Sequence, residues 1–192
     1  MTWNRFSPAA RQAVAGAEAF ARRHGEIARF SSDALGGDFA LGFVAADHLL
    51  LGVSHPDVRA DIWTRLSLDP ADVYAALERA LAAGEWPPPP TDVPLADRPD
   101  PVDVQLDESA QQAMEYAAAE ARRLRHPDIR PEHLLLGALR VGQPRRRAPE
   151  SLGCLVLGQW GVTLESVLTA ILATDAEAGT GLYAPRASAF EP

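Results

Sequence analysis

One short sequence word occurs twice in this chain, and this repeat constrains the fold more than any other feature. The word reads ADHLLLG at residues 46–52 and PEHLLLG at residues 131–137, which is 85 positions later. Residues 7–23 likewise match residues 107–123. A duplicated sequence of this length indicates that one small structural unit has been used twice.

The composition favours helices in both units. The chain has 192 residues, of which 47% are hydrophobic and only 7% are aromatic. Strands are enriched in aromatic and β-branched residues, whereas alanine and leucine, which are abundant here, favour helices. We therefore expect an all-α protein of two four-helix repeats, about eight helices in all, that are related by a pseudo-twofold axis and form one domain.

Capping residues mark where the helices of each repeat begin. Ser7-Pro8 combines a side chain that caps a helix with a proline that fits the first helical turn. The same kind of signal predicts three further helix starts, at Asp107, at Asp69-Pro70 and at Thr163.

The segments between and after the helices set the expected domain boundaries. The first repeat spans residues 1–84 and carries an insert at about 25–41, whose glycines and serines predict a loop with one helical turn. The proline-rich residues 85–105 predict a semi-rigid, extended linker. The second repeat spans residues 106–173, and residues 174–192 are expected to form a flexible tail.

The net charge of −8 argues against strongly anionic partners. Binding to nucleic acid or to an anionic membrane needs a basic face, so neither is expected as a partner. The sequence shows no apolar run that could cross a bilayer and no signal-peptide pattern, which predicts a cytoplasmic protein. The single cysteine, Cys154, fits a reducing compartment and is expected to be a small buried hydrophobic residue.

All 18 basic residues are arginine, so these 192 residues contain no lysine. A phosphate-binding loop of the nucleotide-hydrolysing kind ends in a lysine, and Schiff-base catalysis uses a lysine amine. Neither chemistry is therefore available to this sequence. We expect a protein that is not an enzyme and that needs no cofactor.

The residues around the second word resemble a known family. Residues 122–137, which read RRLRHPDIRPEHLLLG, are similar without a gap to the Clp N-terminal repeat. Two such repeats form the substrate-receiving N-domain of the Clp unfoldases, and the likeness is greatest to the ClpC type. The resemblance covers roughly residues 3–83 and 104–173. We expect a free-standing N-domain without the ATPase modules of an unfoldase.

In ClpC-type domains the resemblance implies two pockets, one in each repeat, that bind phosphorylated arginine. The family's carboxylate falls on Asp47 and Glu132, and its hydroxyl at the start of the long helix falls on Ser7 and Asp107. We therefore expect one site of Ser7 and Asp47, and a second, degenerate site of Asp107 and Glu132. The Asp107 carboxylate would repel a phosphoryl group.

Each of these residues also has a simpler structural role. Ser7 and Asp107 are good helix caps, and a carboxylate in the first turn of a helix, as at Asp47 or Glu132, is stabilised by the helix dipole. His48 and His133 are more typical of core packing or of a hydrogen bond to a neighbouring loop than of a metal site, because an adjacent acid and histidine point in different directions on a helix. No metal is expected.

An apolar surface is expected where the long helices begin, at Trp3, Phe6 and Leu106. In the family this region borders a surface that partner proteins and cyclic-peptide antibiotics use. A hydrophobic contact that fixes the start of each helix is the simpler explanation of the same residues.

Three functional hypotheses remain open from the sequence. The first is a binding module for proteins or peptides, including arginine-phosphorylated ones, that acts as an adaptor, a regulator or an antibiotic-sequestering decoy in Clp-dependent proteolysis. The second is a docking or self-association module with vestigial pockets, with the Clp unfoldase as a partner. The third and least favoured is a hydrolase, because no motif brings a catalytic base to a nucleophile.

Overall fold

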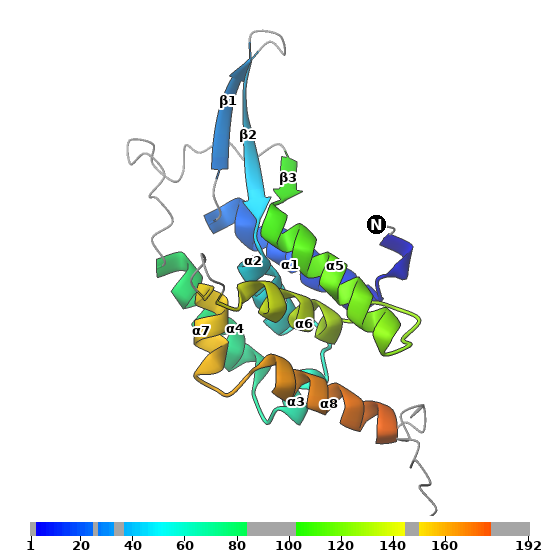
Figure 1. The fold of residues 1–192 in the computed structure, drawn as a ribbon. Helices are drawn as coiled ribbons and strands as arrows, with labels where there is room; N and C mark the ends of the chain where they lie inside the picture. Colours follow the sequence, from blue (N-terminus) through cyan, green and yellow to red (C-terminus); the bar gives the residue numbers. More distant parts are fainter. Residues whose placement is uncertain (1–2, 25–26, 33–36, 84–102, 145–149, 178–192) are drawn as a thin grey trace, which may run out of the picture.

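The computed structural model describes residues 3–24, 27–32, 37–83, 103–144 and 150–177. Within these residues the chain forms two successive sets of four α-helices, so it is an all-α fold with a small sheet (Figure 1). The first set comprises α1 (Pro8–His24), α2 (Ala46–Ser54), α3 (Ile62–Arg65) and α4 (Pro70–Ala83). The second comprises α5 (Glu108–Arg123), α6 (Pro131–Gly142), α7 (Leu152–Gly158) and α8 (Leu164–Glu177).

The capping signals in the sequence placed the helix starts correctly. The helix α1 begins at Pro8, directly after Ser7, and α5 begins directly after Asp107. The closing helices begin at Pro70 and at Leu164, as their signals predict. Each cap residue accepts a hydrogen bond from a backbone amide that has no helical partner, and a short 3-10 helix, η1 (Trp3–Arg5), precedes α1.

The prediction for the insert at residues 25–41 was wrong. Strands β1 (Ile27–Ser32) and β2 (Gly37–Val44) form an antiparallel hairpin there, and β3 (Asp103–Leu106) pairs with β2 in parallel. The hairpin extends away from the helices, and β3 pairs with residues 41–44 of β2, which are the end of that strand nearest the helices (Figure 1). Because β3 begins at Asp103, the end of the predicted linker also belongs to this sheet.

Other predicted segments lie wholly or partly outside the described residues. These include most of the proline-rich linker, since residues 84–102 lie outside the description. The helix α8 continues to Glu177, a few residues beyond the predicted start of the tail, and residues 178–192 lie outside the description. Among the described helices, none combines the length and the apolar character that a membrane span requires.

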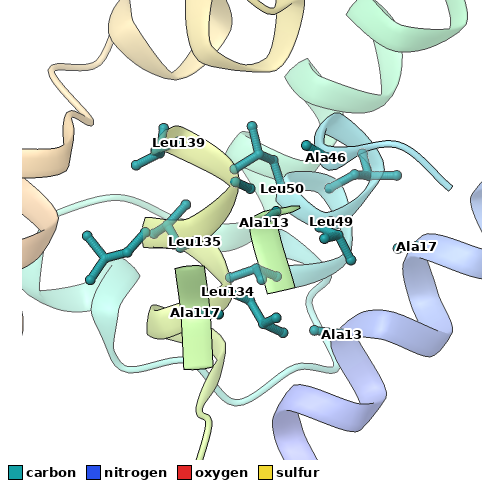
Figure 2. Packing of buried hydrophobic residues seen from close by; sticks show 14 of the residues in the cluster. Ala13, Ala17, Ala46, Leu49, Leu50, Ala113, Ala117, Leu134, Leu135 and Leu139 are labelled. Carbon is teal, nitrogen blue, oxygen red and sulfur yellow. The ribbon is translucent and has the colours of Figure 1, made fainter. Parts of the chain in front are cut away.

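The two word helices, α2 and α6, pack against each other at the centre of the core (Figure 1). Their leucines are buried, and small side chains of the long helices face them, as Figure 2 shows for Leu49, Leu50, Leu134, Leu135, Ala13, Ala17, Ala113 and Ala117. The last residue of each word is a glycine because the long helix passes too close for a side chain. A Cβ atom at Gly52 would overlap the carbonyl oxygen of Ala13, and one at Gly137 would overlap that of Ala113.

The segment before each long helix pairs with the segment before the word helix of the other repeat. Phe6, before α1, pairs with Ile129, before α6, and Leu106, before α5, pairs with Val44, before α2. The backbone N–H of Ser7 donates to the carbonyl of Ile129 at 2.9 Å, and that of Asp107 donates to the carbonyl of Val44 at 3.0 Å. In the same manner α4 packs on α7 and α3 packs on α8. The start of each long helix therefore meets the word helix of the other repeat.

Candidate functional site

A polar cleft of about 310 Å³ lies where the two repeats meet, and we call it the α1–α6 cleft. The first repeat contributes the start of α1 and the residues around the start of α3, and the second contributes the start of α6 and one side of α8. Its lining residues are Ser7, Ala9, Arg59, Asp61, Ile62, Arg130, Pro131, Glu132, Ile171 and Thr174.

The structure corrects how the predicted site residues are paired. Ser7 lies in the same cleft as Glu132, which belongs to the other repeat. Asp47 lies close enough to Asp107 for their negative charges to interact. The predicted sites each paired two residues of the same repeat. This pairing was wrong, because the start of each long helix lies beside the word helix of the other repeat.

The start of α1 forms one wall of the α1–α6 cleft. The Ser7 hydroxyl accepts a hydrogen bond from the backbone N–H of Ala10 at 3.1 Å, which confirms Ser7 as a helix cap. The α-helix that follows is 17 residues long, so its aligned peptide dipoles give its first turn a partial positive charge. This wall therefore favours a negatively charged group.

The carboxylate of Glu132 forms the opposite wall, in the first turn of α6. Its side chain is only 17% exposed, and burial raises its pKa, although its own backbone N–H and the charges of Arg130 and His126 act in the opposite direction. The guanidinium of Arg130 is 3.7 Å from the carboxylate. A buried carboxylate of this kind gains from a positively charged group that can donate hydrogen bonds to it.

Two arginines give the cleft further positive charge. Arg130 precedes α6, and Arg59 lies in the turn before α3. Asp61 adds one negative charge to the same wall as Arg59. The cleft can therefore accommodate a ligand with a cationic part, which would face Glu132, and an anionic part, which would face Ser7 and the arginines.

The equivalent position on the other side of the molecule, which we call the α5–α2 corner, contains two aspartates. Asp107 Oδ1 accepts hydrogen bonds from the backbone N–H of Ala110 at 2.8 Å and from the Ser109 hydroxyl at 2.7 Å. The Ser109 oxygen in turn accepts from the backbone N–H of Ala46 at 2.9 Å. Asp107 is thus a helix cap, as predicted, and hydrogen bonds join the two helices at this corner.

The first turn of α7 covers Asp47 in the α5–α2 corner. Asp47 Oδ1 is buried and makes no hydrogen bond to any described residue, and a Cβ atom at Gly153 would lie only 2.8 Å from it. Burial raises the pKa of Asp47, and the negative charge of Asp107 raises it further. The nearby Ser151 hydroxyl and the backbone amides of α7 act in the opposite direction. The corner therefore has little room for a ligand at Asp47.

The two word histidines cap their own helices. His48 Nδ1 accepts from the backbone N–H of Ala45 at 3.0 Å, and His133 Nδ1 accepts from that of Arg130 at 2.9 Å. Both rings are buried, which confirms the predicted packing and hydrogen-bonding roles. Burial is the main reason that the pKa of His133 falls to about 3. Among the described residues, no group of histidine, cysteine or acidic side chains has the arrangement of a metal site.

A second, more apolar cavity of about 720 Å³ contains all three predicted apolar residues. Phe6 is buried in the core and stacks at a tilt on Trp3, with 5.1 Å between ring centroids, whereas Trp3 is 49% exposed. We call this the Trp3 cavity, and its lining residues are Trp3, Arg5, Phe6, Leu106, Gln111, Met114, Glu115, Ala118, Arg122 and Ile129.

Cys154 is buried in α7, as the sequence predicts. Burial raises the pKa of its thiol to about 11. A thiol with so high a pKa is not a ready nucleophile at neutral pH.

Sequence reasoning missed the arginines of the α1–α6 cleft. A signal for one of them was present, since Arg130 precedes the second word where the first copy has Ala45. Arg59 carries no comparable local signal, because long-range packing of the two repeats places it in the same cleft as Glu132.

Comparisons with known proteins agree with this architecture. The sequence of residues 105–181 matches the Clp repeat (R) N-terminal domain. No curated protein sequence shows a significant match to the chain.

Solved structures resemble the chain over nearly its whole length. A structure described as part of a malarial protein secretion system has a TM-score of 0.61 at 14% identity, and the match covers 92% of this chain and 99% of that one. The N-terminal domain of the chaperone ClpD from Arabidopsis thaliana has a TM-score of 0.54 at 20% identity, covering 91% and 96%. The Hsp104 N-terminal domain from Candida albicans has a TM-score of 0.56 at 14% identity, covering 88% and 91%.

These identities establish a shared fold and no more, so the likeness to the ClpC type in particular stays a prediction. The sequence match lies in the second repeat, and the reciprocal contacts show that the first repeat has the same construction. Residues 105–181 thus match the Clp repeat (R) N-terminal domain in sequence, and the chain as a whole shares its fold with the N-terminal domains of ClpD and Hsp104.

Proposed function

We propose that the protein is a binding module for proteins or peptides in Clp-dependent proteolysis, and that it is not an enzyme. The family of the second repeat and the fold of the whole chain support this proposal. Within the described residues, neither the buried thiol nor the two word histidines lie in an arrangement that would activate a nucleophile.

The ligand that fits the α1–α6 cleft best is an arginine side chain that carries a phosphoryl group. The observation that carries this assignment is the presence of Glu132 and of the α1 start, with two arginines, in one cleft. A carboxylate can accept two hydrogen bonds from a guanidinium group, while a helix start and arginine side chains bind a phosphoryl group. The α5–α2 corner lacks these features, so we expect one phosphoarginine per chain.

The Trp3 cavity supports a second candidate activity, which is the binding of an apolar segment. Its exposed indole and its aliphatic lining suit an apolar side chain of a partner protein or a cyclic-peptide antibiotic, and Arg5, Glu115 and Arg122 supply polar groups at the same cavity. An adaptor, a regulator and an antibiotic-sequestering decoy would each use such a surface. In the alternative of a docking or self-association module, the cleft would be vestigial and this cavity would carry the binding.

The paired variants Glu132→Gln and Asp47→Asn test the site assignment. We expect E132Q to weaken phosphoarginine binding by about 10- to 100-fold, because a charge-assisted pair is lost, and D47N to bind as wild type. Isothermal titration calorimetry with phosphoarginine and with unmodified arginine measures both effects.

The stability of E132Q separates loss of the site from loss of the fold. Because burial raises the pKa of Glu132, the stability that its protonated form contributes is lost as pH rises through that pKa. At neutral pH the uncharged Gln side chain should therefore leave the protein at least as stable in urea. Equal phosphoarginine affinity for wild type and E132Q, or equal losses in E132Q and D47N, would contradict the assignment.

A further inference from the structure

A continuous chain of hydrogen bonds runs from the backbone at the start of α6 to the last turn of α8. The backbone N–H of Arg130 lies 2.9 Å from His133 Nδ1, and His133 Nε2 lies 2.8 Å from His126 Nδ1. His126 Nε2 lies 2.9 and 3.0 Å from the two carboxylate oxygens of Asp175. His126 is only 8% exposed and Asp175 is 18% exposed, so the chain is largely shielded from water.

The chemistry of the two rings fixes the direction of this chain. The N–H of Arg130 can only donate, so His133 Nδ1 must carry a lone pair, and the hydrogen of neutral His133 sits on Nε2. His133 therefore donates to His126 Nδ1, and neutral His126 donates from Nε2 to the Asp175 carboxylate. All three hydrogen bonds are satisfied only when both rings are neutral.

Protonation of His126 breaks this pattern. An imidazolium ring places a hydrogen on His126 Nδ1, which then faces the hydrogen on His133 Nε2 at a separation suited to one hydrogen. His133 can accept from His126 only by moving its own hydrogen to Nδ1, where it meets the N–H of Arg130. One hydrogen bond is lost in either case, while the ion pair of His126 with Asp175 grows stronger.

The groups around His126 connect this chain to the α1–α6 cleft. His126 is hydrogen-bonded to His133 of α6 and to Asp175 of α8, its charge acts on Glu132, and both His126 and Arg130 act on His133. Arg130 and Glu132 line the cleft, and so does Thr174, the neighbour of Asp175. The hydrogen bonds therefore join the wall of the cleft that holds Glu132 to the wall that α8 forms.

We propose that His126, His133 and Asp175 are positioning residues that hold the first turn of α6 against α8, and that protonation of His126 releases this hold and weakens binding in the α1–α6 cleft. The proposal rests on the proposed function for the identity of the ligand, but not for the hydrogen-bond chain itself.

The first repeat supplies an internal control. The backbone N–H of Ala45 donates to His48 Nδ1 as that of Arg130 does to His133. At the position equivalent to Asp175, however, the first repeat has Leu81, which can neither gain nor lose a proton, and the hairpin of β1 and β2 stands where the second repeat has the short turn that carries His126.

Amide hydrogen exchange on the full chain, followed by NMR between pH 5 and 8, tests the hydrogen-bond chain without a ligand. We expect the protection of the Arg130 amide to fall about five-fold relative to that of Ala45 in a single step as His126 gains a proton. In His126→Gln, whose amide can accept from His133 and donate to Asp175 without titrating, this step should disappear.

A constant ratio of Arg130 to Ala45 protection in the wild-type protein, or an unchanged step in H126Q, would overturn the proposal. The binding arm compares the phosphoarginine affinity at pH 7.5 and at pH 6.0 in wild type and in H126Q, so that the ionisation of the phosphoryl group cancels. We expect the wild-type affinity to fall about five-fold more than that of H126Q, and equal falls would refute a link to the cleft. Absence of phosphoarginine binding at every pH would refute the proposed function, and the amide exchange would still decide the hydrogen-bond chain.

Discussion

The α1–α6 cleft and the α5–α2 corner are built from equivalent residues, yet only the cleft is arranged for a ligand. Both lie where the start of a long helix meets the other repeat's word helix. In the cleft, Glu132 lines an open cavity, whereas in the corner the first turn of α7 lies over Asp47. The counterpart of α7 is the shorter helix α3, and the residues at its start line the cleft beside Glu132.

The chemistry of the two positions differs as much as their shape. Arg130 and Arg59 in the cleft correspond to Ala45 and Gly153 in the corner, and Ser7 corresponds to Asp107. The cleft therefore combines two arginines with its carboxylates, whereas the corner holds two aspartates without an arginine among the corresponding residues. This comparison indicates that the core of a repeat can stay constant while the rim of its site diverges.

The glycines of the two words test whether the repeats are equal in their cores. We expect Gly52→Ala and Gly137→Ala each to lower the free energy of unfolding by about 3 kcal/mol, because the added methyl group meets a backbone carbonyl that cannot move aside. Urea unfolding followed by circular dichroism measures the loss.

Gly158→Ala is the matched control, because a Cβ atom there meets nothing within 4 Å. It should be neutral or slightly stabilising, since alanine favours a helix more than glycine does. A wild-type stability for either word variant would show that the helices of that repeat do not approach as closely as described.

The acid stability of the second repeat should depend on His133. Because the pKa of His133 is lowered to about 3, the unfolded chain binds a proton between roughly pH 6.5 and pH 3 that the folded chain does not. Stability therefore decreases as pH falls through this window, by about 2 kcal/mol between pH 8 and pH 5. Urea unfolding at several pH values should show the free energy of unfolding decreasing with falling pH in wild type and decreasing less steeply in His133→Gln. The same pH dependence in both proteins would contradict this role of His133.

The hydrogen bonds at the corner predict a smaller effect, of about 1 kcal/mol. Ser109→Ala removes the link between Asp107 and the N–H of Ala46, so its free energy of unfolding should fall by that amount. The mirror change, Ala9→Ser in the cleft, should change stability by less than about 0.5 kcal/mol, because the equivalent of Ala46 is Pro131, which has no N–H to donate. Equal effects of the two changes in thermal unfolding would contradict the different construction of the two positions.

The helices could be predicted from the sequence because their signals are local. A cap at Ser7 or Asp107 acts through amides within one turn of the helix, so a few neighbouring residues decide where the helix starts. The hairpin at Ile27–Ser32 and Gly37–Val44 was missed although Phe39, Leu41 and Phe43 alternate as they do in a strand. The glycines and serines near them favoured a loop.

Which residues meet in the α1–α6 cleft and in the α5–α2 corner could not be predicted in the same way. The sequence identified Ser7, Asp47, Asp107 and Glu132 as candidates, and the structure places all four at the two equivalent positions. A repeat in sequence does not say which copy of a helix packs beside which. The assignment of partners depends on long-range contacts, such as that of Ser7 with Ile129, which leave no local pattern.

The central claim is that one ligand site exists and that both repeats contribute to it. Titration of the 15N-labelled full chain with phosphoarginine, followed by backbone amide NMR, tests this most directly. The account predicts a single binding event in which the amides of Ala9 and Glu132, from different repeats, shift together with one dissociation constant, while the amide of Asp47 does not shift. Shifts of Ala9 together with Asp47, or two independent sites with different constants, would contradict it.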